Sequence, residues 1–167
     1  MDDERFKNVD DVIAALNEIL SETDISDFTK SRFAGLVAVE AVCAFELIIR
    51  NIIFEFCRND SELFGGFVQS RFKRLKGRIG ISDLKTNFLS HFGVEYVSKF
   101  DGILEELRNS AFAIGEPDPT LRYDNILQNR HTFTHEGSIS LTYEEVIVYY
   151  QDACKVIIAL ERTLDGS

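Results

Sequence analysis

The feature that most constrains the fold of this chain is a long apolar run, FAGLVAVEAVCAFELIIRNIIFEF, at positions 33–56. Its apolar residues recur mostly at intervals of three and four, which predicts a helix, and others fall on a second face. We therefore expect this helix to be the central member of the core, running from an N-cap at Ser26 or Asp27 to about Arg58. Four charged residues within the run argue against a membrane span: Glu40, Glu46, Arg50 and Glu55.

The rest of the chain also predicts helices. Only two prolines and ten glycines interrupt its 167 residues, which favours long helices over a turn-rich β architecture. Further helices are expected at about 10–20, 67–78, 83–92, 94–109, 118–136 and 142–164. We therefore expect an all-α fold: a helical bundle with a long central helix and additional short helices, in a single domain over residues 1–167.

Local signals predict where these helices begin and end. The predicted breaks are RNDSELFGG (58–66), a weak point at Gly102, and AIGEPDPT (113–120), where prolines and a glycine exclude regular structure. The predicted caps are Ser82 for the helix over 83–92, Gly137 at a helix C-terminus, and Thr142 with Glu145 as a capping box.

The balance of charge limits how this chain could contact nucleic acid. Its formal net charge is −10, so its overall field does not attract RNA, and any such contact requires a local basic patch. RFKRLKGR (71–78) packs five basic residues into eight positions. The candidate RNA-binding residues are Arg71, Lys73, Arg74 and Arg78, with Phe72 available for packing or base stacking. The alternative is a solvated basic face that balances nearby acids.

The cysteines and the N-terminal residues indicate in which cellular compartment the protein is expected. Cys43, Cys57 and Cys154 are odd in number, widely spaced and embedded in apolar helical patterns, which predicts small core residues in a reducing compartment. The opening MDDERFK has no basic segment leading into an apolar run, so no secretory signal is expected. These features predict a soluble cytoplasmic protein with no membrane contact.

A polar stretch, QNRHTFTHEG at 128–137, holds two of the three histidines in the chain. His131 and His135 are four residues apart and share a helix face, whereas Arg130 lies roughly 140° round the helix from His135 and about 7.5 Å along its axis. Three interpretations are open. The stretch is a hydrated helix end, or a metal site of the two histidines with Glu136, for which no third ligand can be placed. Alternatively, it pairs an acid–base residue with a phosphate-binding cation, which suits phosphodiester chemistry.

The third interpretation matches a known family. The spacing Arg-x4-His, from Arg130 to His135, resembles the signature of HEPN domains. The segment YDNILQNRHTFTHEGSISLTYEEVIVYYQDACKVIIALE (123–161) resembles the C-terminal half of the stand-alone prokaryotic HEPN proteins of the MAE or RiboL-PSP type, and VAVEAVCAFELIIRNI (37–52) is similar to their second helix. One departure is Glu136, which stands between His135 and Gly137 where that branch usually has His-Gly. An added carboxylate there can hold the histidine's proton more tightly or repel phosphate.

The resemblance implies a metal-independent endoribonuclease that needs no cofactor. His135 would be the general acid–base for the RNA 2′-OH or the leaving 5′-oxygen, and Arg130 would hold the scissile phosphate. His131 would orient the phosphate or support His135, and Asn129 would be an outer polar group. Glu40, on the long helix, either faces solvent or turns towards the motif, and Glu46 with Arg50 is spaced for an ion pair.

The resemblance also implies partners. The family usually forms two-fold homodimers whose motifs face a shared cleft, where Arg130 of one chain can meet His135 of the other. An RNase of a defence or toxin–antitoxin type acts on RNA and needs restraint, so a cognate antitoxin or inhibitor protein is expected. The alternative is a non-catalytic HEPN module that binds a nucleotide or a protein partner. The net negative charge of the chain also fits this role.

Overall fold

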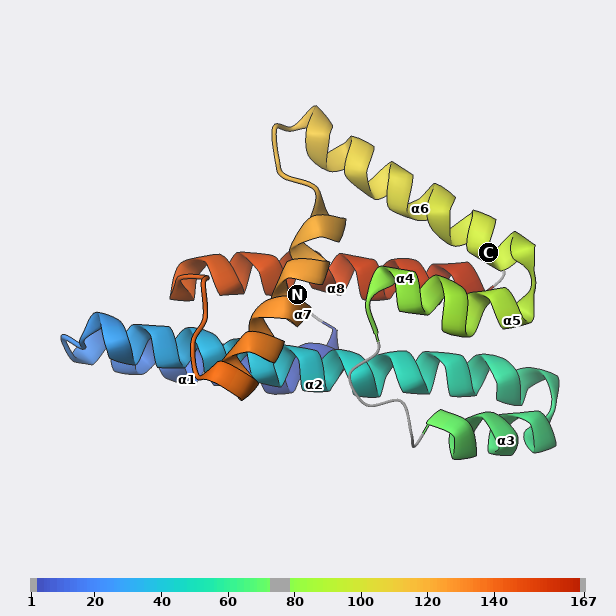
Figure 1. Ribbon diagram of the computed structural model, residues 1–167, viewed down its shortest axis with the longest axis horizontal. Coiled ribbons are helices and arrows are strands. Elements are labelled where there is room, and N and C mark those ends of the chain that lie inside the picture. The colour runs from blue at the N-terminus through green and yellow to red at the C-terminus, as the bar shows by residue number, and fades with distance from the viewer. Residues whose placement is uncertain (1–2, 73–78, 166–167) are drawn as a thin grey trace.

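A computed structural model describes residues 3–72 and 79–165, and over these residues the chain is all α-helical, as predicted (Figure 1). The elements are η1 (Glu4–Phe6), α1 (Lys7–Glu22), α2 (Asp27–Asp60), α3 (Glu62–Phe72), α4 (Ile81–Leu84), the π-helical η2 (Lys85–Leu89), α5 (Ser90–Phe92), α6 (Val94–Ala113), α7 (Pro119–Glu136) and α8 (Tyr143–Leu164). No helix within these described ranges is both long and apolar enough to cross a membrane.

Helix α2 is the centre of the bundle, which confirms the expectation drawn from its apolar run. It begins at the Ser26 cap, whose hydroxyl accepts from the Thr29 amide, and packs against α1, α3, α7 and α8. Phe45 on α2 is fully buried. The centroid of its ring lies 6.3 Å from that of Phe6, 6.0 Å from that of Tyr123 and 6.1 Å from that of Tyr150. Burying such a ring stabilises a fold by about 1.5–3 kcal/mol, so this aromatic cluster fixes where η1, α7 and α8 meet α2.

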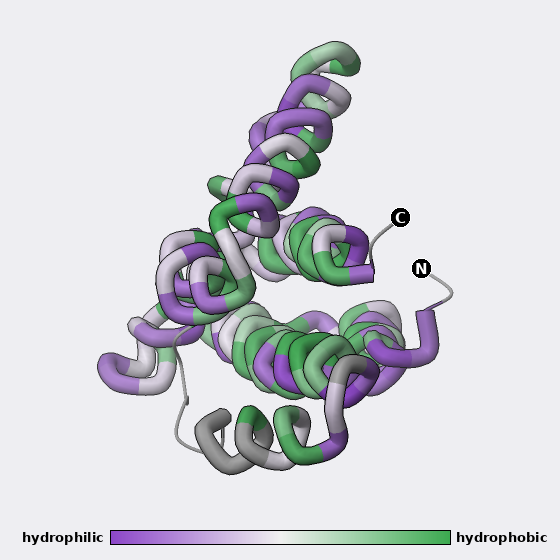
Figure 2. The backbone as a smooth tube through the Cα atoms, turned by 90° about the vertical axis from the view of Figure 1, so that its right-hand side faces the viewer, coloured by the Kyte–Doolittle hydropathy of each residue, from purple (hydrophilic) through white to green (hydrophobic). Residues whose placement is uncertain are grey.

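Helix α6 buries few of its residues, namely Phe100, Leu104 and Ala111. It packs mainly against α8, and Figure 2 shows it extending away from the bundle with purple and green alternating along its length. Gly102 does not interrupt α6, because the helix runs unbroken from Val94 to Ala113, past the predicted end at residue 109. The predicted loop over 113–120 is correspondingly shorter, since α7 begins at Pro119.

The predicted break at RNDSELFGG is wrong in extent. Only Ser61 separates α2 from α3, and α3 runs through both glycines. A Cβ at Gly65 would lie 3.1 Å from the Arg58 Cβ and 3.2 Å from its Cα, so this glycine serves close packing between the two helices. The predicted basic helix over 67–78 is helical through Phe72, and positions 73–78 lie outside the described residues.

The predicted cap at Ser82 is also wrong. Helix α4 begins at Ile81 with Gly80 as its N-cap, and the Ile81 amide donates to the Asp124 carboxylate at 3.3 Å. A side chain distant in the sequence therefore replaces the expected local cap.

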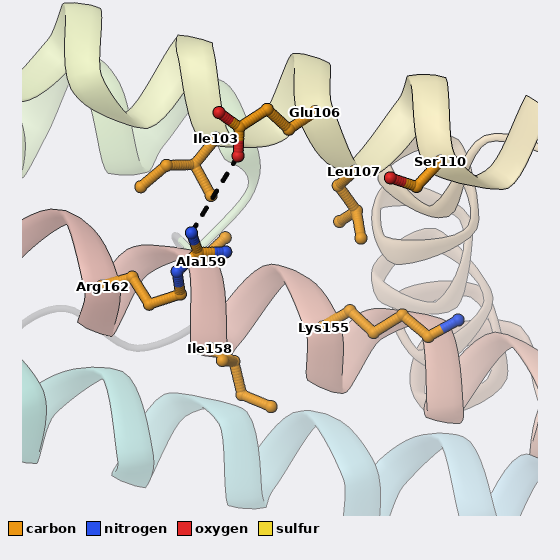
Figure 3. Close-up of a pocket in the computed structure, with 8 residues that line it drawn as sticks. All are labelled: Ile103, Glu106, Leu107, Ser110, Lys155, Ile158, Ala159 and Arg162. Atoms are coloured by element: carbon orange, nitrogen blue, oxygen red, sulfur yellow. Dashed lines mark ion pairs between the residues drawn. The ribbon is translucent and has the colours of Figure 1, made fainter.

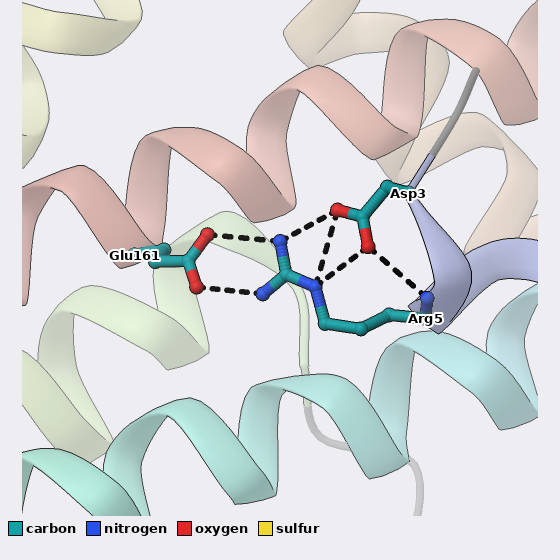
Figure 4. Close-up of polar contacts among 3 residues, drawn as sticks. All are labelled: Asp3, Arg5 and Glu161. Carbon is teal, nitrogen blue, oxygen red and sulfur yellow. Dashed lines mark hydrogen bonds and ion pairs between the residues drawn. The ribbon is translucent and has the colours of Figure 1, made fainter.

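The other predicted caps are confirmed. Gly137 follows α7 with φ of 70°, a left-handed conformation that favours glycine, and Thr142 and Glu145 form both hydrogen bonds of a capping box. At the chain's other end, Arg5 links η1 to α8, because its guanidinium meets the Glu161 carboxylate at 2.7 and 2.9 Å and also binds Asp3 (Figure 4). This partly exposed network orients η1 more than it stabilises the fold.

Candidate active site

Helix α7 carries the Arg-x4-His motif, and its first half is fixed by buried polar contacts. The hydroxyl of Tyr123 is buried and donates to the Ile79 carbonyl at 2.6 Å; burial raises the pKa of Tyr123 well above its usual range. Arg122 binds the buried carboxylate of Asp152 on α8 at 2.5 Å, and Lys155 binds the other oxygen of that carboxylate at 2.6 Å. These contacts fix α7 to the segment before α4 and to α8.

Asn129 occupies the position next to the motif arginine and is buried. Its Nδ2 donates to the backbone and side-chain oxygens of Asn125 at 3.0 and 2.6 Å. Its Oδ1 accepts from the amide and hydroxyl of Ser140 at 2.9 and 2.8 Å. These four bonds use the whole hydrogen-bonding capacity of the amide. Asn129 therefore ties the α7–α8 connection to α7 and leaves no group for a substrate.

The two histidines lie together, as their spacing predicted. His131 and His135 are both exposed, with ring centroids 4.5 Å apart and ring planes inclined by 51°. At 100° per residue, they face the side of α7 opposite Phe133, the residue that packs on α2. Two imidazoles at this distance can divide the work of a general acid and a general base.

Arg130 lies on a different side of α7 and is partly buried. Its Nε is buried, and no hydrogen-bond acceptor within the described fold reaches it. The described contacts join Arg130 to neither histidine, consistent with the angular separation along the helix. A single chain thus brings the histidines together but does not bring the arginine to them.

Sequence reasoning missed Arg32, which caps the C-terminal end of α7 from α2. Its Nη1 donates to the Gly137 carbonyl at 2.7 Å, and its guanidinium lies 5.2 Å from the centre of the Phe28 ring and 5.4 Å from that of Phe133. The two bonded residues are 105 positions apart, so no local pattern could signal the contact. Arg32 adds a fixed positive charge beside the turn that carries His135.

A glycine on α2 allows this end of α7 to approach. The Phe133 ring lies where a side chain of residue 35 would stand, and a Cβ added at Gly35 would be 2.1 Å from that ring. Because Gly35 is inside a long helix, its role is close packing and not a break. The position of this turn of α7 therefore depends on residue 35 being a glycine, which has no side chain.

The remaining acidic candidates have no partner close to the motif. Glu40 is partly buried and Glu136 is exposed, and in the described part of the chain neither forms an ion pair. The expected pair of Glu46 and Arg50 is wrong: within the described ranges Glu46 Oε1 is buried without a hydrogen-bond partner. Glu46 lies near enough to Tyr123 to help raise the pKa of its hydroxyl, after burial, Asp124 and Asp83.

The side chains of the predicted RNA-binding residues cannot be placed. Lys73, Arg74 and Arg78 lie outside the described residues, and Arg71 is in the last turn of α3 with a side chain that is not described. Among the side chains that are described, no three of His, Cys, Asp or Glu gather closely enough to hold a metal ion. The third histidine, His91, lines a separate pocket with Phe56 and Phe92.

A cleft between α6 and α8 is another concave feature lined by charged side chains (Figure 3). Leu107 and Ile158 supply its apolar surface, and Lys155 and Arg162 line its edge. Both cations already face acids of this chain, because Lys155 binds Asp152 and Arg162 lies 3.9 Å from Glu106. No histidine lines the cleft, so α7 remains the better candidate for chemistry.

The fold and the site define a class of protein: an all-α bundle with a long central helix and an Arg-x4-His motif in the last turns of a crossing helix. The chain belongs to the RiboL-PSP-HEPN family, whose sequence profile matches residues 3–166. This confirms the resemblance drawn from the motif and, of the two types considered, supports the RiboL-PSP type. No curated protein and no solved structure matches the chain. Family membership indicates an RNase or a nucleotide-binding module.

Proposed function

We propose that this protein is a metal-independent endoribonuclease and that Arg130, His131 and His135 carry its chemistry. The observation that carries the proposal is the partly buried Arg130, whose Nε lacks a hydrogen-bond partner in the described fold. Leaving a buried donor unpaired costs about 1–3 kcal/mol, and more for a charged group. A substrate phosphate would complete this guanidinium, since arginine binds phosphate through paired N–H donors.

The residues divide the reaction as follows. One imidazole of the His131–His135 pair takes the proton of the RNA 2′-OH as that oxygen attacks the phosphorus. The bond to the 5′-oxygen breaks, and the leaving oxygen receives a proton from the second imidazole. Arg130 stabilises the negative charge that builds on the phosphate oxygens. The products are a 2′,3′-cyclic phosphate and a free 5′-OH, with no metal in any step.

The geometry of α7 favours a site made by two chains. Arg130 and His135 point to different sides of their helix, so a homodimer that faces two α7 helices would let the arginine of one chain meet the histidine of its partner. A defence or toxin–antitoxin role in the cytoplasm, held in check by an inhibitor protein, belongs to the same proposal.

A non-catalytic module that binds a nucleotide or a protein is the second candidate. The observation in its favour is Glu136, an exposed carboxylate directly after His135, on a chain with a net charge of −10. A carboxylate at this position opposes the approach of phosphate.

RNA cleavage in excess chelator tests the proposal. We expect the native chain to cut single-stranded RNA and leave 2′,3′-cyclic phosphate ends, and we expect Arg130→Ala and His135→Ala each to lower the rate by about 10²–10³-fold. His91→Ala is the matched control, because this histidine lies in another pocket and its loss should leave the rate unchanged. If the native chain cuts no RNA, or if all three variants cut equally well, the binding module replaces the nuclease.

A further inference from the structure

Phe28 is an aromatic side chain left exposed in the first turn of the central helix. Its relative exposure is 70%, although α2 is the central helix of the bundle. A single exposed apolar residue needs no explanation. Phe28, however, is one of a pair: the guanidinium of Arg32, one helical turn later, lies over its ring.

Arg32 is held rigidly and still has donors to offer. The Gly137 carbonyl accepts one N–H of the Arg32 guanidinium, whose carbon lies 5.2 Å from the centroid of the Phe28 ring and 5.4 Å from that of the Phe133 ring. In the described part of the chain, no acceptor bonds to Nε or Nη2 of Arg32. A planar cation fixed against an exposed ring is the arrangement that single-stranded RNA bases stack on.

We propose that Phe28 and Arg32 form a stacking site for one base of single-stranded RNA, next to the motif on α7. This inference rests on the proposed RNase function, since it names a substrate contact of the same site. The base would stack on the face of Phe28 that Arg32 leaves open, and the free N–H groups of Arg32 would bind the base edge.

The position of Phe28 relative to the histidines determines which nucleotide of the RNA would stack on it. Arg32 bonds to Gly137, two residues after His135, so the stacking site adjoins the turn that ends α7. The histidines face away from Phe133 and hence away from α2. The RNA strand must therefore pass round the C-terminal end of α7. Phe28 would then hold a neighbouring nucleotide, and not one of the two nucleotides that the cleaved bond joins.

Nearby acids restrict what else this site can bind. Asp27 precedes Phe28 in the chain and Glu136 precedes Gly137, so the phosphates of a strand gain little from the local field. Stacking is much less sensitive to this field than phosphate contacts are. The site should therefore add affinity for unpaired bases that changes little with salt, and none for double-stranded RNA.

The absence of tryptophan from the chain makes the test specific. Phe28→Trp introduces the only tryptophan, which can be excited selectively over the five tyrosines, and a base that stacks on it quenches its emission. Placed in a His135→Ala background, this variant would be titrated with oligoadenylate of roughly ten nucleotides, within the length range of single-strand sites. Phe112→Trp in the same background is the matched control, because Phe112 is 84% exposed at the far end of α6.

We expect oligoadenylate to quench the Phe28→Trp variant and not the Phe112→Trp variant. By fluorescence anisotropy of labelled RNA, Phe28→Ala should bind about tenfold more weakly, while Phe28→Tyr and Phe112→Ala bind as the parent does. If RNA binds but the Phe28→Trp emission does not change, or if Phe28→Ala binds normally, the stacking site is wrong while the nuclease can stand. If no RNA binds, the stacking site is also overturned, and the chelator assay separately decides the nuclease.

Discussion

Asn129 and Arg130 are neighbours in the sequence but differ in how the fold uses them. The Asn129 amide makes four hydrogen bonds to Asn125 and Ser140, whereas the Nε of Arg130 makes none within the described fold. Because buried polar groups are rarely left unpaired, the difference separates Asn129, whose amide the fold satisfies, from Arg130, whose Nε the described fold leaves without a partner. The family resemblance alone assigned both residues to the site.

Replacing Asn129 should therefore affect folding and not chemistry. Asn129→Ala leaves the Ser140 amide and hydroxyl without their acceptor, and we expect the free energy of unfolding to fall by about 1–3 kcal/mol in urea denaturation. Under conditions where the variant remains folded, RNA cleavage should stay within about threefold of native. His131→Ala is the converse control: it is exposed, so its stability should change by less than about 0.5 kcal/mol while cleavage drops. A folded Asn129→Ala variant of native stability that no longer cuts RNA would contradict this assignment.

Residue spacing predicted one contact in the site and failed on two others. The four-residue interval brought His131 and His135 together, because neighbours on a helix face meet whatever surrounds them. The same rule suggested an ion pair of Glu46 with Arg50, but such a pair is worth only about 0.2–0.5 kcal/mol, and the fold instead buries Glu46 Oε1 without a hydrogen-bond partner among the described residues. Arg32 was not foreseen, since its bond to Gly137 depends on how two distant helices cross.

At the scale of the element, glycines were the main source of error. The sequence treats a glycine as a helix breaker, yet α3 runs through Gly65 and α6 through Gly102. The cost of a helical glycine is about 0.5–1 kcal/mol, which tertiary packing readily offsets. Caps that use only local residues, such as Thr142 with Glu145, were predicted correctly, whereas the start of α4 depends on Asp124 from α7 and was not.

Two helical glycines should respond oppositely to alanine. Gly35→Ala places a Cβ 2.1 Å from the Phe133 ring, so α7 must shift, and we expect a loss of about 1–3 kcal/mol in the free energy of unfolding. Nothing lies within 4 Å of a Cβ at Gly102, so Gly102→Ala should stabilise the protein by about 0.5–1 kcal/mol. Urea denaturation measures both changes. Equal effects at the two positions would show that Phe133 does not rest on Gly35.

The whole molecule explains why the fold was easier to predict than the site. The apolar run at 33–56 had to be buried on several sides, which required a bundle around one long helix, and α2 packs against four helices accordingly. The site depends instead on the angle at which α7 crosses α2, and the contacts that set this angle join residues far apart in the chain. Spacing within a helix cannot specify such an angle.

The divergence of Arg130 and His135 on α7 leads to a test at the level of the assembly. If each site takes its arginine from one chain and its histidine from the other, then Arg130→Ala and His135→Ala complement each other when mixed. A mixed dimer holds one site with both residues intact and one with neither. Refolding the two inactive variants together at equal concentration should restore about a quarter of the native cleavage rate, because half of the dimers are mixed. Each variant refolded alone is the control and should remain inactive. A mixture as inactive as its components would show instead that arginine and histidine act within one chain, which would require α7 to change shape on binding RNA.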